Sequence, residues 1–108
     1  MAARLHVMDT AAARRRALQP TASVWVAASA GTGKTTVLTG RVLSLMIAGA
    51  APERLLCLTF TKAAAAEVAN RIADRLGRWA TCAENVLRDE ITELTGEAPD
   101  AERCRHAR

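Results

Sequence analysis

Aromatic residues are scarce in this sequence, whose 108 residues include one phenylalanine, two tryptophans and no tyrosine. Alanine is frequent instead, with 24 copies, and alanine buries little apolar area when a chain folds. The core must therefore be thinner than the 50% share of apolar residues suggests. A chain of this length suits one small domain and is only marginally stable by itself.

Cysteine is also sparse, with copies only at Cys57, Cys82 and Cys104. Their number is odd and they lack the spacing of metal ligands, and Cys104 with His106 forms only a lone C-x-H pattern. We therefore expect reduced thiols, as in a cytoplasmic protein. No apolar run approaches the ~20 residues that a membrane-spanning helix needs, so we expect no membrane partner.

The charge is unbalanced in the basic direction, at +4, and almost all of the basic residues are arginines. A basic chain is compatible with a nucleic-acid or nucleotide partner. A solvated basic surface is an equally good explanation, and composition alone does not decide between the two.

The apolar pattern along the chain predicts the order α-β-α-β-α-α. Helical spacing of apolar residues alternates with two short apolar segments that are typical of buried parallel strands. The expected elements are helices over 11–18, 34–48, 62–76 and the residues before Gly96, with strands over 24–27 and 55–60. A strand, a crossover helix and a second strand form a βαβ unit. An isolated sheet of two parallel strands is a poor fold, so we expect the chain to be part of a larger protein.

A phosphate-binding pattern follows the first expected strand, in the segment Ala28-Ser29-Ala30-Gly31-Thr32-Gly33-Lys34-Thr35. Gly31 and Gly33 permit backbone angles that let successive N–H groups surround an anion. The next helix presents its N-terminal N–H groups and the positive end of its dipole. Lys34 then places a charge on the β- and γ-phosphates, and the Thr35 hydroxyl binds Mg²⁺. Thr36 completes the expected nucleotide contacts.

The alternative to a phosphate site is a glycine-rich turn that binds nothing. A chance match in a chain of this length is on the order of one in a hundred at average residue frequencies. The apolar segment before the pattern and the helix after it favour the phosphate site. We therefore predict an α/β fold, the N-terminal βαβ portion of a RecA-like P-loop NTPase domain, with parallel strands, flanking helices and an incomplete sheet. Its expected cofactors are ATP and Mg²⁺.

Two motifs together resemble those of superfamily 1 UvrD-like DNA helicases. The phosphate-binding segment is similar to their nucleotide loop, which often begins with alanine, as Ala28 does here. About 24 residues after Thr35, the segment Thr59-Phe60-Thr61-Lys62-Ala63-Ala64-Ala65-Ala66-Glu67 resembles their motif Ia. Residues 23–26 and 57–63 narrow the resemblance to AddA-type helicase–nuclease subunits, which process double-strand DNA breaks. The resemblance implies that residues 1–108 are the N-terminal part of a helicase ATP-binding domain.

The resemblance also implies a DNA site at Thr59, Phe60, Thr61 and Lys62, because motif Ia of such helicases contacts single-stranded DNA. Phe60 would lie against a base, and Thr61 and Lys62 would hold the backbone. The implied partners are a second helicase–nuclease polypeptide and single-stranded or broken double-stranded DNA. An equally good explanation of Phe60 is a core aromatic at a strand end.

Three arginines further along, Arg71, Arg75 and Arg78, have a simpler explanation than DNA binding. Glu67 precedes Arg71 by four residues, and Asp74 precedes Arg78 by four, so both pairs suit ion pairing along one helix. We therefore expect these arginines to form a solvated helix face.

The sequence departs from the helicase pattern at two places. These helicases place a glutamine upstream of the loop to recognise adenine, whereas this chain has Arg14, which has donors only. Their Asp-Glu motif, which holds Mg²⁺ and orients the attacking water, follows an apolar strand. Here the adjacent pair Asp89-Glu90 lies at helical spacing between Leu87 and Ile91, so we expect it to face solvent. Adenine selectivity and ATP hydrolysis are therefore not expected of this chain alone.

Three functions remain open from the sequence. The leading hypothesis is the ATP-binding segment of a DNA helicase acting in double-strand break repair and recombination, with Lys34 and Thr35 as its catalytic residues. The second is a P-loop small-molecule kinase, which would need a lid with arginines and a catalytic carboxylate. The third is a non-catalytic nucleotide- or DNA-binding fragment.

Overall fold

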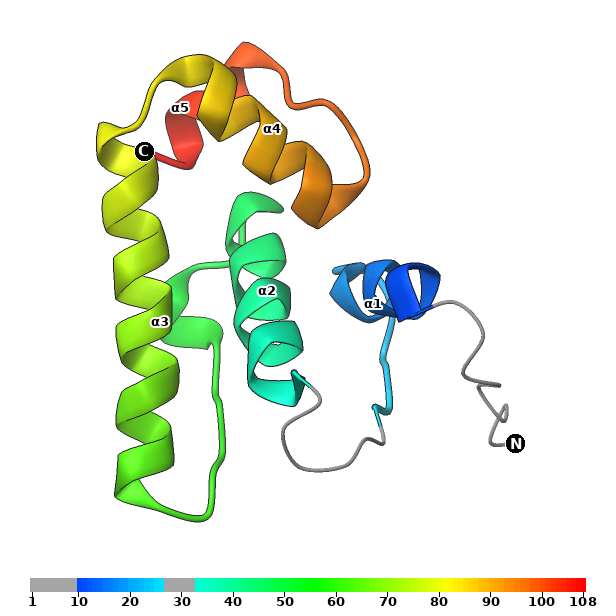
Figure 1. Cartoon of the computed structure of the whole chain (residues 1–108), viewed down its shortest axis with the longest axis vertical. Coiled ribbons are helices and arrows are strands. Elements are labelled where there is room, and N and C mark those ends of the chain that lie inside the picture. The colour runs from blue at the N-terminus through cyan, green and yellow to red at the C-terminus, as the bar shows by residue number, and fades with distance from the viewer. Residues whose placement is uncertain (1–9, 27–32) are drawn as a thin grey trace.

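The computed structural model describes residues 10–26 and 33–108, and the regular structure within them is helical (Figure 1). In chain order the elements are α1 (Thr10–Leu18), α2 (Lys34–Ile47), the 3₁₀ turn η1 (Pro52–Arg54), α3 (Lys62–Thr81), α4 (Glu84–Thr95) and α5 (Ala101–His106). None of these helices is both long enough and apolar enough to cross a membrane.

The predicted α/β fold with parallel strands is wrong for the described residues, which contain no strand. Residues 24–26 and 55–60 stay without regular structure, and Ala27 lies outside the described part of the chain. Trp25 is 87% exposed, and Leu56 and Leu58 are each 82% exposed. An apolar run favours an extended, buried segment, but a strand forms only when its backbone groups pair with a neighbouring strand. Neither segment has such a neighbour among the described residues.

Local signals set most helix ends, and several predicted boundaries are confirmed. Gly49, at φ +105°, ends α2 one residue earlier than expected, and the Gly49 N–H bonds back to the Met46 carbonyl. Thr61 caps α3 as predicted, since its hydroxyl accepts from the Ala64 N–H at 3.0 Å. Gly96, at φ +77°, ends α4, and the Asp100 carboxylate caps α5.

Helix α3 is longer than the sequence predicts, because it continues through Gly77 to Thr81. A glycine inside a helix costs about 1 kcal/mol relative to alanine. Trp79, just beyond it, is only 1% exposed and belongs to the core. Burial of that large side chain offsets the cost of the glycine.

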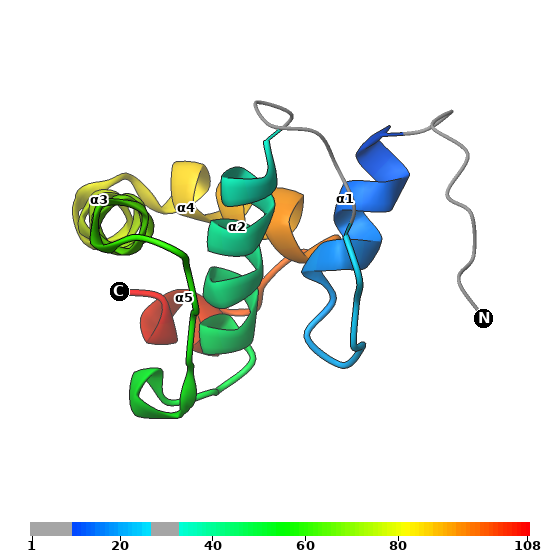
Figure 2. The ribbon, with the colours of Figure 1, turned by 90° about the horizontal axis from the view of Figure 1, so that it is seen from below.

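Helix α2 lies between α1 and α3, and α4 and α5 lie across its C-terminal end (Figure 1). The view from below shows the same order of α1, α2 and α3 (Figure 2). Helices α2 and α3 run in the same direction. The core gathers at the end where α2 meets α4 and α5 and consists of Leu43, Ile47, Trp79, Leu87, Ile91, Leu94, Cys104 and Ala107. The opposite end of α2, where the predicted phosphate site lies, is outside this core.

Candidate nucleotide-binding site

The N-terminal end of α2 is the described part of the predicted phosphate site. Gly33 precedes the helix in a left-handed conformation, at φ +89° and ψ 22°, which suits glycine and not a residue with a Cβ. No side chain caps this end, and the first turn carries no acidic residue. The first N–H groups of a helix have no intrahelical acceptor, so this end presents donors and a positive dipole end without a protein counter-charge in its own first turn.

The predicted nucleotide contacts divide at residue 33. Ala28, Ser29, Ala30, Gly31 and Thr32 lie outside the described residues. Lys34 and Thr35 are the first two residues of α2, with Lys34 exposed and Thr35 half-buried. The backbone of Thr35 is held from within the helix, because the Thr39 hydroxyl donates to its carbonyl at 2.8 Å.

Arg14 of α1 reaches the start of α2. A Cβ built on Gly33 would lie 3.2 Å from a terminal nitrogen of Arg14. The residue in the place of the family's glutamine therefore lies directly beside the described end of the predicted phosphate loop. Its side chain forms no ion pair with any described residue, whereas several other arginines of the chain do.

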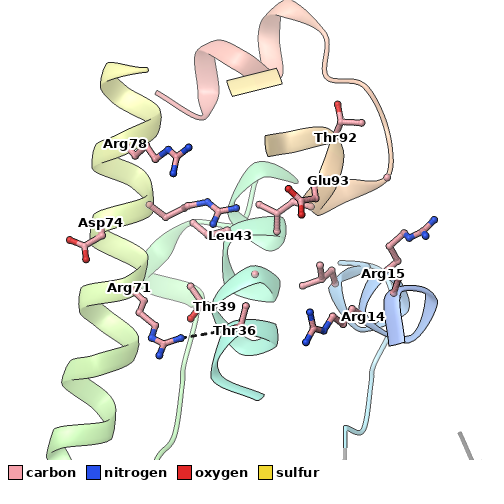
Figure 3. A pocket seen from close by; sticks show the side chains of 16 residues that line it. Arg14, Arg15, Thr36, Thr39, Leu43, Arg71, Asp74, Arg78, Thr92 and Glu93 are labelled. Atoms are coloured by element: carbon pink, nitrogen blue, oxygen red, sulfur yellow. Dashed lines mark hydrogen bonds between the residues drawn. The ribbon is translucent and has the colours of Figure 1, made fainter. Parts of the chain in front are cut away.

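Arg71 of α3 approaches the same end of α2 from the other neighbouring helix. Its guanidinium forms a 2.7 Å ion pair with Glu67, as the i,i+4 spacing predicts. A second nitrogen lies 3.5 Å from the Thr36 hydroxyl, at the outer limit of a hydrogen bond (Figure 3). Thr36 thus contacts α3 in the structure, in addition to its predicted role in nucleotide binding.

A cleft of about 1170 Å³ opens between α1, α2, α3 and α4. Figure 3 shows Arg14 on the α1 side of this cleft and Arg71 on the α3 side, with Thr36 between them. Arg15, Arg75 and Arg78 also line the cleft, against two acidic lining residues, Asp74 and Glu93. Volumes of about 300–1,000 Å³ are typical of small-molecule sites, so the cleft is large enough for a nucleotide.

Arg41 is a positioning residue that the sequence did not reveal. From the middle of α2 its guanidinium donates to the carbonyls of Ala17 at 2.8 Å and Gln19 at 3.0 Å, and also to that of Ala22. These carbonyls belong to the end of α1 and the turn after it. The contact fixes α1 against α2 and so determines where Arg14 lies relative to Gly33.

The residues of the predicted DNA site are all exposed and lie before and at the start of α3. Phe60 is fully exposed, so the alternative of a core aromatic is wrong for this structure. The Thr59 hydroxyl donates to the Thr61 carbonyl at 3.0 Å, while Thr61 caps α3. Lys62 is the first residue of α3. The cap and the turn hold this segment at an exposed helix start.

Two sequence-based expectations about acidic residues are wrong. Arg78 pairs with Glu90 of α4 at 2.8 Å rather than with Asp74. Glu90 also accepts from the Trp79 indole N–H at 2.6 Å and lies 3.1 Å from Nε of Arg75, and its side chain is 12% exposed rather than facing solvent. Helical phase within α4 did not reveal that α3 packs on this face. Asp89 is exposed, as expected.

The described residues contain no group of three or more His, Cys, Asp and Glu side chains that suits a metal ion. Thr35 remains the predicted Mg²⁺ ligand. A hydroxyl at this position supplies one oxygen, and phosphates and water supply the others in sites of this chemistry.

Comparisons with known proteins show the family of the chain. Residues 9–97 match the family model of the UvrD/REP helicase N-terminal domain. The match covers most of the chain, and the chain therefore belongs to that family. No solved structure matches it.

Similar curated proteins narrow the relationship. The chain is 42% identical over 74 residues to an ATP-dependent helicase/nuclease protein of the AddA type from Oenococcus oeni, and the match covers 68% of this chain and 6% of that protein. It is 57% identical over 49 residues to the protein of the same name from Lactobacillus helveticus, covering 45% and 4%. It is 39% identical over 75 residues to "Probable DNA helicase II homolog" of Rickettsia conorii, covering 62% and 12%. The chain thus spans a small part of the relatives that it matches.

Proposed function

We propose that this chain is the ATP-binding segment of a DNA helicase that acts in double-strand break repair and recombination. The observation that carries the proposal is the uncapped start of α2, with Gly33 at positive φ and Lys34 exposed, in a chain of the UvrD/REP family. The alternative of a small-molecule kinase has no such family support. A non-catalytic binding fragment remains the second candidate, because the described residues supply binding groups and little hydrolytic machinery.

Each binding group has a defined role in this proposal. The N–H groups at the start of α2 donate to phosphate oxygens, and the helix dipole stabilises their charge. The ammonium group of Lys34 neutralises the β- and γ-phosphates, and the Thr35 hydroxyl would hold Mg²⁺, which supplies further charge neutralisation when bound. These groups bind and orient the phosphates, but they do not activate water.

The attacking water needs a carboxylate that the described residues do not offer near α2. Asp89 is exposed on α4, and Glu90 is occupied by Arg75, Arg78 and Trp79. Hydrolysis also needs a cation on the developing charge, which is worth roughly 10³–10⁵ in rate in related nucleotide hydrolases. We therefore assign nucleotide binding to this chain and place hydrolysis in the larger helicase.

DNA binding is proposed for the exposed segment Thr59–Lys62. An exposed aromatic ring stacks on any base, and a lysine neutralises a backbone phosphate. Phe60 supplies the ring and Lys62 the charge. Because α2 and α3 run in the same direction, their N-terminal ends, and hence Lys34 and Lys62, lie toward the same end of the molecule (Figure 1).

The two lysines of the chain provide a matched test. Lys34→Ala is expected to abolish Mg-ATP binding in calorimetry while leaving the binding of a fluorescent oligo(dT) unchanged. Lys62→Ala is expected to weaken oligo(dT) binding, steeply so as salt rises, and to leave Mg-ATP binding unchanged. Both lysines are exposed, so neither change is expected to affect the helical circular dichroism signal. Unchanged Mg-ATP affinity in Lys34→Ala contradicts the assignment of the phosphate site.

A further inference from the structure

The start of α2 has a guanidinium group on each side of it. Arg14 comes from α1 and lies beside Gly33, and Arg71 comes from α3 and lies beside Thr36 (Figure 3). Gly33 and Thr36 are three residues apart, and residues at this spacing are neighbours on a helix surface. The two arginines therefore approach adjacent positions at the end of α2 that presents free N–H groups.

Neither arginine is held there by a strong contact to α2. The Arg71 to Thr36 distance of 3.5 Å is too long for a strong hydrogen bond. Arg14 has no ion pair with a described residue and meets only the small face of a glycine at Gly33. Each guanidinium has five N–H donors, and Arg71 uses one nitrogen on Glu67 and another on Thr36. Most of the donor capacity at this end of α2 is unused.

The other arginines of the cleft are in a different situation. Arg75 and Arg78 share the carboxylate of Glu90, at 3.1 and 2.8 Å, and so tie α3 to α4. Arg15 points away from α2 in Figure 3. Of the two acidic lining residues, Asp74 points away from α2 in that view, and Glu93 lies on α4. The positive charge that faces the start of α2 is therefore that of Arg14 and Arg71.

We infer that Arg14 and Arg71 form a two-arginine clamp that binds the polyphosphate chain of the ligand from both sides. This inference rests on the proposed function and deepens it, because it assigns two phosphate ligands outside the phosphate-binding segment. Guanidinium groups bind phosphate oxygens through charge-assisted, often paired hydrogen bonds. Since the clamp recognises phosphate and not a base, inorganic tripolyphosphate is a ligand of the same site.

Calorimetric titrations with Mg-tripolyphosphate, Mg-ATP and adenosine test the clamp. Arg14→Ala and Arg71→Ala are each expected to weaken the binding of both polyphosphates by the same factor, about fivefold to tenfold. Adenosine is expected not to bind the parent chain measurably. Arginine variants that lose ATP affinity but keep tripolyphosphate affinity would show that these residues contact the base or ribose, which overturns the clamp.

Matched controls separate this role from a structural one. Arg16→Ala removes an exposed arginine of α1 that does not line the cleft. Arg88→Ala removes an i,i+4 ion pair with Glu84 on α4, comparable in exposure to the Arg71–Glu67 pair. Both controls are expected to bind tripolyphosphate as the parent does. Circular dichroism at 222 nm verifies that each variant is folded.

A change of opposite sign gives the sharpest arm of the test. Glu67→Gln removes the carboxylate that competes with phosphate for Arg71, so tripolyphosphate affinity is expected to rise about twofold to fivefold. A purely structural Arg71 predicts no gain. If Lys34→Ala abolishes binding but the Arg14, Arg71 and Glu67 variants match the parent, the clamp fails and the proposed function stands. If the parent binds neither polyphosphate, both fail.

Discussion

Glu90 joins α3 to α4, and its replacement has a calculable effect on stability. The Trp79 indole N–H donates to Glu90 at 2.6 Å, and Trp79 is 1% exposed, so loss of the acceptor leaves a buried donor unsatisfied. Such a loss costs about 1–3 kcal/mol. The ion pairs with Arg75 and Arg78 add less, about 0.5–1 kcal/mol together, because those side chains are 39% and 61% exposed.

Glu90→Ala should therefore lower the free energy of unfolding by about 2–3 kcal/mol, which for a domain of this size corresponds to a melting temperature about 10–20 °C lower. Glu90→Gln keeps an oxygen that accepts from Trp79 and should cost about 1 kcal/mol. Thermal unfolding followed by circular dichroism measures both. The neighbouring Asp89→Ala, at an exposed position, is the control. An Asp89→Ala variant as destabilised as Glu90→Ala would refute the reasoning.

Three further predictions concern the start of α2 and the limits of the chain. Gly33→Ala should cost about 1–2 kcal/mol in unfolding experiments, since alanine is strained at φ +89° and its Cβ would press on Arg14; an unchanged melting temperature would contradict this. Arg41→Ala should weaken Mg-tripolyphosphate binding by releasing α1, whereas Arg41→Lys should restore it only partly, because lysine lacks the fork that reaches three carbonyls. Steady-state ATP turnover with single-stranded DNA present should be at least roughly a thousandfold below helicase-like rates; helicase-like turnover that is lost in Lys34→Ala would reveal a missed carboxylate.

The sequence predicted features that depend on a few neighbouring residues. Gly49 and Gly96 end their helices, and Thr61 and Asp100 cap theirs, because each signal acts within one turn of the chain. The Glu67–Arg71 pair is of the same kind. The amino-acid pattern at residues 33–36 likewise indicated a helix start suited to phosphate.

Features that depend on distant partners were not predictable in this way. The apolar segments at 24–27 and 55–60 were expected to form strands, but a strand needs a second backbone beside it, and the described residues provide none. Glu90 was assigned to solvent from the phase of α4 alone, although its partners are on α3. The approach of Arg14 and Arg71 to α2 also required three helices to be placed in space.

The most direct test of the central claim is a titration of the ¹⁵N-labelled chain with Mg-ATP, followed by amide chemical shifts in NMR spectra. If the start of α2 binds the phosphates, the largest shift changes occur at the amides of Gly33, Lys34, Thr35 and Thr36, and those of α4 and α5 stay nearly unchanged. Binding without changes at the start of α2, or with the largest changes in α4 and α5, would contradict the account.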